Sequence, residues 1–344
     1  MRKLAGLLLA GFIAAPSTTA FAQDVTTVNV IMPLPRSAHF YPLIVGEALG
    51  YFEDEGVEVN LLPSSTTIPY VAFVQNQQAD LAMLDPSETF AAVSAGADVK
   101  VVYEVMQNAP EGIAVSADSP VANVSELKGT TVGLVSDRDR NTLGIALGTA
   151  DLTIDDVTTV VVGEAGPTLA NAFKTQSVSA IAGAVPDWLA LQANGMQIKM
   201  ITPEEVSQTP ANSFVISASR IDELREPIQG FLRAWSKAMH VAEIDPDAVA
   251  EMSKAAVPEE WENEEFGRQF LDASIPMNVS STERAGDLQP EIWSAIQPRM
   301  VAVGALQAEV DPATFLDNSF IEFANDWDAE TVKADVKAWK DANQ

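Results

Sequence analysis

The chain has 344 residues, no cysteine and a formal net charge of −28 at neutral pH. The absence of cysteine excludes thiol redox chemistry, a cysteine nucleophile and cysteine-ligated metals, so stability must come from packing. The strong negative charge argues against nucleic acid or an anionic membrane as a partner, because both are themselves polyanions. The length is enough for two ordinary domains with hydrophobic cores.

The first 22 residues have the pattern of a secretory signal peptide. Arg2 and Lys3 give it a positive start, an apolar run extends over residues 4–15, and Ala20-Phe21-Ala22 is a small-x-small cleavage site. We therefore predict cleavage after Ala22 and export of the mature chain. The alternative, a buried N-terminal helix, requires the break at Pro16 and the Ala-Phe-Ala ending to be accidental. No later stretch approaches ~20 consecutive apolar residues, so no membrane-spanning helix is expected.

Strands and helices alternate from residue 25 onward, which predicts a mostly parallel sheet covered on both faces. A β-rich run ends at Pro33-Leu34-Pro35, and Gly50 stands where the following helix should end. The predicted order is strand 25–32, helix 42–51, strand 57–62, helix 68–76, strand 81–84, helix 87–95 and strand 100–106.

A second unit with the same alternation begins near residue 124. Two extended runs, 112–116 and 213–217, flank this unit and lack the Gly, Pro and Ser content of a flexible linker. Paired stiff crossings between two α/β lobes predict a hinge. The predicted elements of the second unit are strand 131–135, a helix from about residue 142, strand 159–162, helix 168–175, strand 180–182, helix 187–194 and strand 199–201.

From Arg220 onward the pattern is helical. We assign these helices to the first lobe, which makes that lobe discontinuous in sequence. The amphipathic stretches are 228–244, 247–256, 262–272, 291–303 and 331–343. The predicted organisation is a signal peptide at 1–22, lobe I at 23–113 and 217–344, and lobe II at 114–216.

Four motifs in sequence order resemble a known family. Residues 46–59 are similar to the "helix, Gly-Tyr-Phe, acidic pair, Gly, strand" signature of periplasmic substrate-binding proteins of ABC importers. The subgroup they resemble handles nitrate, taurine, alkanesulfonates and thiamine-precursor pyrimidines. Residues 77–82 resemble its Gly-x-Ala-Asp-Ile-Ala motif, 126–133 its Asp-Leu-Lys-Gly-Lys-x-Val-Gly motif, and 173–180 its Ala-Leu-x-x-Gly-x-Val-Asp-Ala motif.

The resemblance covers about residues 28–216. It implies an α/β, two-lobed type II periplasmic binding protein fold, in which two mostly parallel sheets flanked by helices are joined by a two-strand hinge. It also implies a periplasmic protein that closes on a small molecule and delivers it to a membrane permease. We expect a monomer with no cofactor and no metal. Gln78 and Gln176 replace usual glycines and Ser179 replaces the usual aspartate, so two turns are expected to differ in detail.

Ligands of open parallel sheets bind beyond the carboxyl ends of the strands, where loops and helix N-termini present free N–H groups. The loop after the first strand carries Arg36, His39, Phe40 and Tyr41. Arg36 would hold a carboxylate or sulfonate, His39 would donate or accept a hydrogen bond, and either aromatic ring would stack on a flat ligand. The alternatives are a surface ion pair for Arg36, a structural hydrogen bond for His39 and a core position for Phe40.

The next two strand ends of the first lobe supply further candidates. Ser64, Ser65 and Thr66 follow the second strand, where they cap a helix or bind an anionic or polar group. Asp85 follows the third strand and is the candidate acceptor for an ammonium or a ring N–H, with Ser87 beside it. Glu88 at the same helix start suits the helix dipole without any ligand.

The strand ends of the second lobe supply the remaining candidates. Arg138, Arg140 and Asn141 follow its first strand, and either arginine would close over an anion. The alternative for this loop is a solvated run of alternating charges. Asp187 and Trp188 open a later helix, Asp187 as an N-cap or ligand acceptor and Trp188 as an aromatic lid.

A binding module that closes around its ligand is the leading functional hypothesis. An enzyme would depend on carboxylates or on His39, because thiols are absent and no Gly-x-Ser-x-Gly, His-Glu-x-x-His or phosphate-binding glycine loop is present. A third hypothesis, a sensor without transport, differs only in what the closed form docks to.

The candidate residues point to two ligand classes. Two arginine-bearing loops and the Ser/Thr cluster favour a sulfonate or carboxylate anion, including aromatic or amino-bearing ones. Asp85, Asp187 and the neighbouring aromatic residues favour a pyrimidine-like or other heteroaromatic ligand, or a zwitterion with a cationic group. At this stage we rank the anion first.

Overall fold

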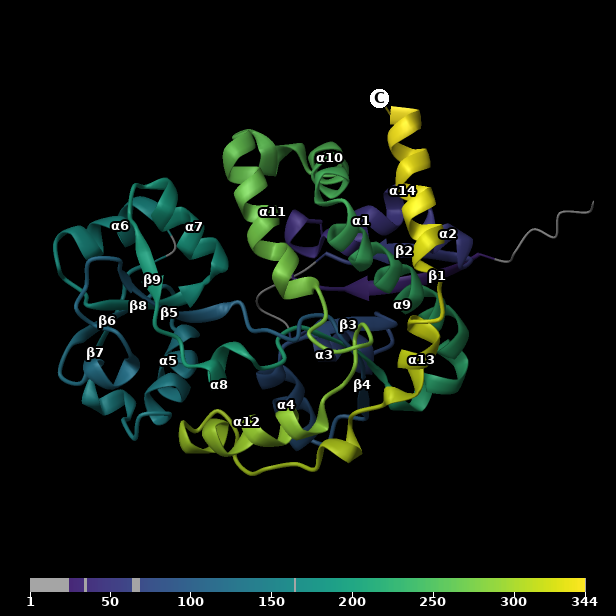
Figure 1. Cartoon of the computed structure of the whole chain (residues 1–344). Helices are drawn as coiled ribbons and strands as arrows, with labels where there is room; N and C mark the ends of the chain where they lie inside the picture. Colours follow the sequence, from purple (N-terminus) through teal and green to yellow (C-terminus); the bar gives the residue numbers. More distant parts are fainter. Residues whose placement is uncertain (1–24, 34–35, 64–68, 164, 344) are drawn as a thin grey trace, which may run out of the picture.

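The computed structural model describes residues 25–33, 36–63, 69–163 and 165–343. Within this part of the chain the strands form two separate five-stranded sheets, each flanked by helices (Figure 1). The predicted two-lobed α/β fold is confirmed. The predicted signal peptide lies outside the described residues, as do Ser64, Ser65 and Thr66.

The first sheet has the strand order β2-β1-β3-β10-β4, and β10 is antiparallel to both of its neighbours. Its strands are β1 (Thr26–Ile31), β2 (Val57–Leu61), β3 (Leu81–Leu84), β4 (Val99–Glu104) and β10 (Ser213–Ser217). All four residues of β3 are buried, as expected for a central strand with helices on both faces. The helices between these strands are α1 (Tyr41–Ala48), α2 (Tyr51–Asp54), α3 (Tyr70–Gln75) and α4 (Pro86–Ser94).

The second sheet has the order β7-β6-β8-β5-β9, and β5 is antiparallel to both of its neighbours. Each sheet therefore contains one antiparallel strand, and it is the first strand after the chain crosses from the other sheet. The strands are β5 (Glu111–Ser116), β6 (Thr131–Leu134), β7 (Thr158–Val161), β8 (Ala180–Ala184) and β9 (Ile198–Met200). The helices are α5 (Asp139–Gly148), α6 (Gly166–Lys174), α7 (Val185–Ala193) and α8 (Glu204–Ser207).

The two connections between the sheets run side by side. Val105 N and Met106 N donate to Asn212 O at 2.9 and 3.0 Å, and Ala211 N donates to Met106 O at 2.9 Å. The runs predicted to cross, 112–116 and 213–217, are instead β5 and β10, which lie inside the sheets. Their backbone groups pair with strands that lie far away in sequence. An extended apolar run has the same sequence pattern whether it connects two lobes or pairs within a sheet.

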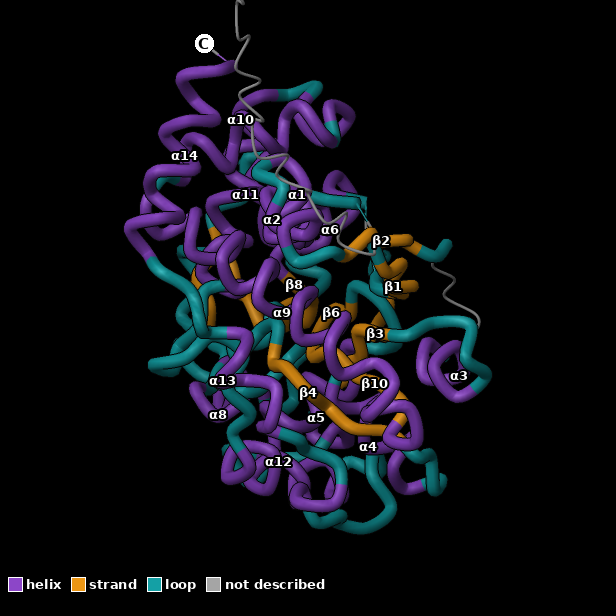
Figure 2. Tube along the Cα trace, turned by 90° about the vertical axis from the view of Figure 1, so that its right-hand side faces the viewer, coloured by secondary structure: helices purple, strands orange, loops and turns teal. Residues whose placement is uncertain are grey.

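The C-terminal helices cover the first sheet, and two of them also reach the second lobe. α11 packs against α7, and α12 packs against α5. Seen from the side of the first lobe, α1, α10 and α11 lie above the strands and α4 and α12 lie below (Figure 2). The helices are α9 (Ile221–Ile244), α10 (Pro246–Ala256), α11 (Glu264–Asn278), α12 (Pro290–Ala302), α13 (Ile321–Ala324) and α14 (Ala329–Asn343).

The core of the first lobe forms where α9 packs against α1 and α2. Phe231 and Trp235 of α9 are completely buried there, and their rings pack against Phe214 of β10. Among the residues described, no helix is both long enough and apolar enough to cross a membrane.

Two exposed glutamines hold backbone conformations that favour glycine. Gln77 has φ 57° and Gln176 has φ 55°, both in the left-handed region. Gln176 directly follows the last turn of α6, where the chain reverses toward β8. At the other turn the left-handed residue is Gln77, which aligns with the glycine of the Gly-x-Ala-Asp-Ile-Ala motif, so the expected replacement of that glycine by Gln78 is off by one residue. A side chain at such a φ costs roughly 1–2 kcal/mol.

We expect Gln176→Gly to raise the free energy of unfolding by about 1 kcal/mol, because glycine adopts this φ without steric cost. For a chain of this size the unfolding temperature should rise by about 2 °C. Gln192→Gly, at an exposed site inside α7, is the matched control and should lower the free energy by a similar amount. A lower unfolding temperature for Gln176→Gly would contradict the strain at this turn.

Candidate ligand-binding site

Charged side chains from both lobes interact where the strands of the two sheets end. Asp85 and Glu88 belong to the start of α4 in the first lobe, and Arg138 and Asp139 to the start of α5 in the second. Glu111 is the first residue of β5. Asp85 and Asp139 raise the pKa of Glu111, and Arg138 lowers that of Glu88, so charges of one lobe act on those of the other. We call these five residues the interlobe charge cluster.

Two carboxyl groups of the interlobe charge cluster are crowded by burial and by neighbouring charge. Burial, aided by Asp85, raises the pKa of Glu88 to about 7, although the Tyr70 backbone N–H and Arg138 oppose the shift. Burial also raises the pKa of Glu111 to about 7, with smaller contributions from Asp85 and Asp139. Both groups are therefore partly protonated at neutral pH, and a cation or hydrogen-bond donor between the lobes would favour their ionised forms.

The other two carboxylates of the cluster are oriented by local hydrogen bonds. Asp85 caps α4, because its Oδ1 accepts the Glu88 N–H at 2.8 Å. Asp139 Oδ2 accepts from Ser136 N at 2.6 Å and from Ser136 Oγ at 2.9 Å. These contacts hold each carboxylate at a strand end. Asp85 remains exposed, as does Ser87 in the same turn.

The loop after β1 does not present its candidate side chains together. Arg36 forms a two-pronged pair with Glu47, at 2.5 and 2.9 Å, and its side chain is 43% exposed. Phe40 and Tyr41 are buried in the first lobe, where Tyr41 Oη donates to Met239 O at 3.1 Å. His39 is also buried, and its Nδ1 lies 3.1 Å from Ser274 Oγ. The charge of the Arg36 guanidinium is therefore already neutralised by Glu47, and this pair lies at the surface rather than in the core.

The remaining candidates of the second lobe are divided between the surface and the core. Arg140 reaches Thr159 at 2.8 Å and Asp137 at 3.1 Å, and Asn141 is exposed on the first turn of α5. Asp187 Oδ2 accepts the Ala184 N–H at 2.8 Å at the start of α7. Trp188 is 7% exposed and packs with the hydrophobic core of this lobe.

A buried glutamine ties the first crossing to the C-terminal part of the chain. Gln107 Oε1 accepts from Ser281 N at 2.7 Å, and its Nε2 donates to Thr282 Oγ1 and Asp287 O, both at 3.0 Å. This contact anchors the crossing on the first lobe. The sequence analysis missed Gln107, Glu111 and Asp139 as site residues and gave Glu88 only a helix-dipole role. Gln107 precedes β5 and Glu111 begins it, whereas the predicted candidates all follow strand ends.

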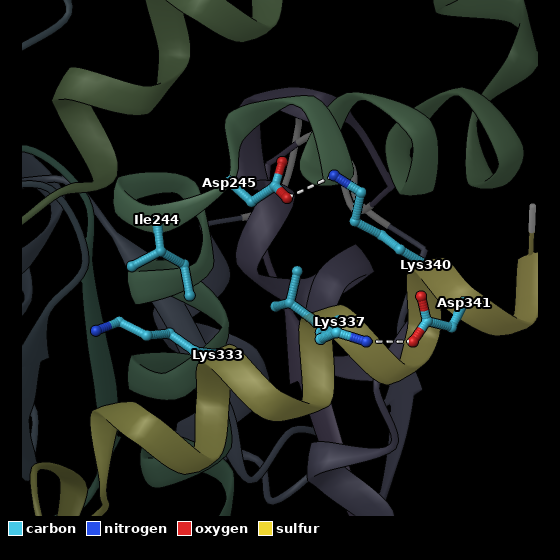
Figure 3. A pocket seen from close by; sticks show the side chains of 7 residues that line it. Ile244, Asp245, Lys333, Lys337, Lys340 and Asp341 are labelled. Carbon is cyan, nitrogen blue, oxygen red and sulfur yellow. Dashed lines mark hydrogen bonds and ion pairs between the residues drawn. The ribbon is translucent and has the colours of Figure 1, made fainter.

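A groove of about 390 Å³ lies away from the strand ends, between the end of α9 and α14. Lys340 pairs with Asp245 at 2.7 Å and Lys337 with Asp341 at 2.5 Å, and Lys333 points away from both (Figure 3). Lys333 pairs with Glu330 at 2.6 Å. Because these lysines do not converge and all three are paired with carboxylates, we assign no ligand to this groove. Among the described residues no cluster of histidine and carboxylate side chains has the arrangement of a metal site.

Comparisons with known proteins agree with this architecture. The family model described as NMT1/THI5 like matches residues 37–249. The riboflavin-binding protein RibY of Chloroflexus aurantiacus is 26% identical over 324 residues, which span 89% of this chain and 88% of that protein. The periplasmic aliphatic sulphonate binding protein SsuA of Escherichia coli has a TM-score of 0.66 at 15% identity, covering 84% of this chain and 91% of that one. The desulfurization enzyme DSZB has a TM-score of 0.60 at 15% identity, covering 87% and 98%.

The raised pKa of Glu111 predicts a pH dependence of stability. Its pKa of about 7 in the folded chain exceeds the ordinary 4.5, so its contribution to stability is complete below pH 4.5 and is lost as the pH rises through 7. The variant Glu111→Gln cannot ionise. Its unfolding temperature relative to the wild type should therefore rise between about pH 4.5 and about pH 7 and level off above that range.

The matched control for this measurement is Glu226→Gln, at an exposed position of α9. It should follow the wild-type curve at every pH. If Glu111→Gln also follows that curve, the carboxyl group of Glu111 is not crowded in the folded protein.

Proposed function

Because the chain belongs to the NMT1/THI5-like family, we propose that it serves as the substrate-binding protein of an ABC importer in the periplasm. In this proposal it captures a small solute between its lobes and delivers it to a membrane permease. The two-lobed fold with paired crossings supports the proposal, as do the names of its structural neighbours. The expected signal peptide agrees with a periplasmic location.

We assign the site to an uncharged or cationic heteroaromatic ligand that carries N–H donors, such as a flavin or pyrimidine. The interlobe charge cluster has four carboxyl groups and a single guanidinium, so its field repels a sulfonate or carboxylate. Arg36, the expected anion anchor, is paired with Glu47. This electrostatic balance is the observation that carries the assignment, and it reverses the ranking from sequence. The name of the relative RibY supports the flavin.

Binding and closure are linked in this proposal through contacts made with both lobes. A donor placed between α4 and α5 would interact with carboxyl groups of the first lobe and of the second at the same time. Only the closed arrangement gives it both sets of contacts, so the ligand shifts the population toward closure. The crossings allow this movement because they bend as a pair.

A ligand panel tests the proposal. The mature chain, residues 23–344, is titrated with riboflavin, a pyrimidine, taurine and ethanesulfonate, and unfolding temperature is recorded. Riboflavin at about 100 times its Kd should add roughly 2.7 kcal/mol and raise the unfolding temperature by several degrees. The sulfonates should cause no shift.

Two results would contradict the proposal. A shift with a sulfonate and none with riboflavin or the pyrimidine would restore the anion as the ligand. Recovery of a chemically altered ligand after incubation, measured by mass spectrometry, would indicate an enzyme that uses the same fold.

A further inference from the structure

Asn278, the last residue of α11, carries a buried acceptor without a donor. The residue is 1% exposed, and its Nδ2 donates to His39 O at 2.8 Å and to Ser274 O at 3.0 Å. Because both amide hydrogens are used, the orientation of the side chain is fixed. Its Oδ1 is fully buried and accepts no hydrogen bond from any described residue. An acceptor left in this state costs about 1–3 kcal/mol.

A second asparagine shows how the same arrangement is completed elsewhere in the fold. Asn325 Nδ2 donates to Ile321 O, four residues earlier, and to Ala285 O in a distant loop. Asn278 uses its Nδ2 in the same two ways. At Asn325, however, Oδ1 accepts the Ala285 N–H at 2.8 Å. The distant loop thus satisfies both ends of the Asn325 amide.

The loop that meets Asn278 gives it a carbonyl but no N–H. The backbone N–H of His39 is directed to Ser37 Oγ at 3.2 Å. This loop contains the short helix η1 (Ala38–Phe40) and lies beyond the carboxyl end of β1. That is the edge of a parallel sheet at which ligands bind.

The neighbouring histidine is oriented as a second acceptor. Ser274 Oγ donates its only hydrogen to Phe270 O at 2.8 Å, so in its contact with His39 it accepts the hydrogen of Nδ1. Burial lowers the pKa of His39 to about 4, which keeps the ring neutral. The lone pair of the ring is therefore on Nε2, so the His39 side chain adds an acceptor, and not a second donor, beside Asn278.

Asn278 lies where α11 bridges the two lobes. α11 packs against η1 of the first lobe and against α7 of the second (Figure 1). Leu189 of α7 is buried in the hydrophobic core of the first lobe, so α7 of the second lobe also contacts the first lobe directly. Movement of α7 away from α11 would open the contact between these two helices.

We propose that Asn278 Oδ1 accepts a ring N–H of the captured heteroaromatic ligand and so helps to select it. The inference rests on the proposed function and adds a specificity residue from α11, outside the interlobe charge cluster. The ligand N–H donates to Asn278 Oδ1 in the way that the Ala285 N–H donates to Asn325 Oδ1. Its N–H then satisfies an acceptor that the chain has already placed and oriented.

The test measures riboflavin affinity by quenching of the flavin fluorescence. Asn278→Leu removes the acceptor and should weaken binding about ten- to hundredfold. Asn278→Asp, protonated in this buried position, keeps an acceptor and one donor and should stay within about threefold of the wild type. Asn325→Leu is the matched control: it should lower the unfolding temperature without changing the affinity. Asn278→Ala serves as a second truncation if the leucine variant does not fold.

A chemical variant of the ligand makes the test independent of stability. 3-Methylriboflavin lacks the ring N–H of the oxidised flavin, so the wild type should bind it about tenfold or more weakly than riboflavin. Asn278→Leu and Asn278→Ala should not distinguish the two flavins. Wild-type binding of riboflavin with unchanged affinity in both truncations would overturn the role of Asn278 alone. No riboflavin binding by the wild type would overturn the flavin assignment and this inference with it.

Discussion

The two segments that join the sheets are held side by side, and this pairing determines how the lobes move. Val105 and Met106 share backbone hydrogen bonds with Ala211 and Asn212, so neither crossing bends without the other. Gln107 fixes the first crossing to the loop after α11. A paired joint of this kind favours bending of one lobe toward the other over sliding or twisting. The facing carboxyl ends of the strands are then the surfaces that a ligand brings together.

Features that reduce the stability of the ligand-free chain lie along these facing surfaces. Glu88 and Glu111 are crowded carboxyl groups with a raised pKa, and Asn278 has a buried oxygen without a donor. At Asn325 a backbone N–H satisfies the corresponding side-chain oxygen. Local departures from good packing and pairing are expected at functional sites. The ring N–H of a flavin would supply the donor at Asn278, and its ribityl hydroxyl groups can donate to the carboxyl groups, which links ligand chemistry to closure.

The central strands were predictable because they are buried on both faces and each has a short apolar run. Leu81–Leu84 is an example in which all four residues are buried. The roles of residues 112–116 and 213–217 were not predictable, because the strand that each pairs with lies far away in sequence. Asp85 was found because it ends a strand. The sequence does not show which asparagine keeps an unsatisfied Oδ1, Asn278 or Asn325. The difference is a backbone N–H that the fold brings to Asn325 and does not bring to Asn278.

The most direct test of capture between the lobes is a distance measured across them. The chain has no cysteine, so spin labels attach only at an introduced pair, such as Glu265→Cys on α11 and Asn171→Cys on α6, both exposed. Electron paramagnetic resonance then gives the distance distribution with and without riboflavin. We expect a broad, longer distribution without ligand and a single shorter distance when riboflavin is bound. An unchanged distribution in a sample with bound riboflavin would contradict capture between the lobes.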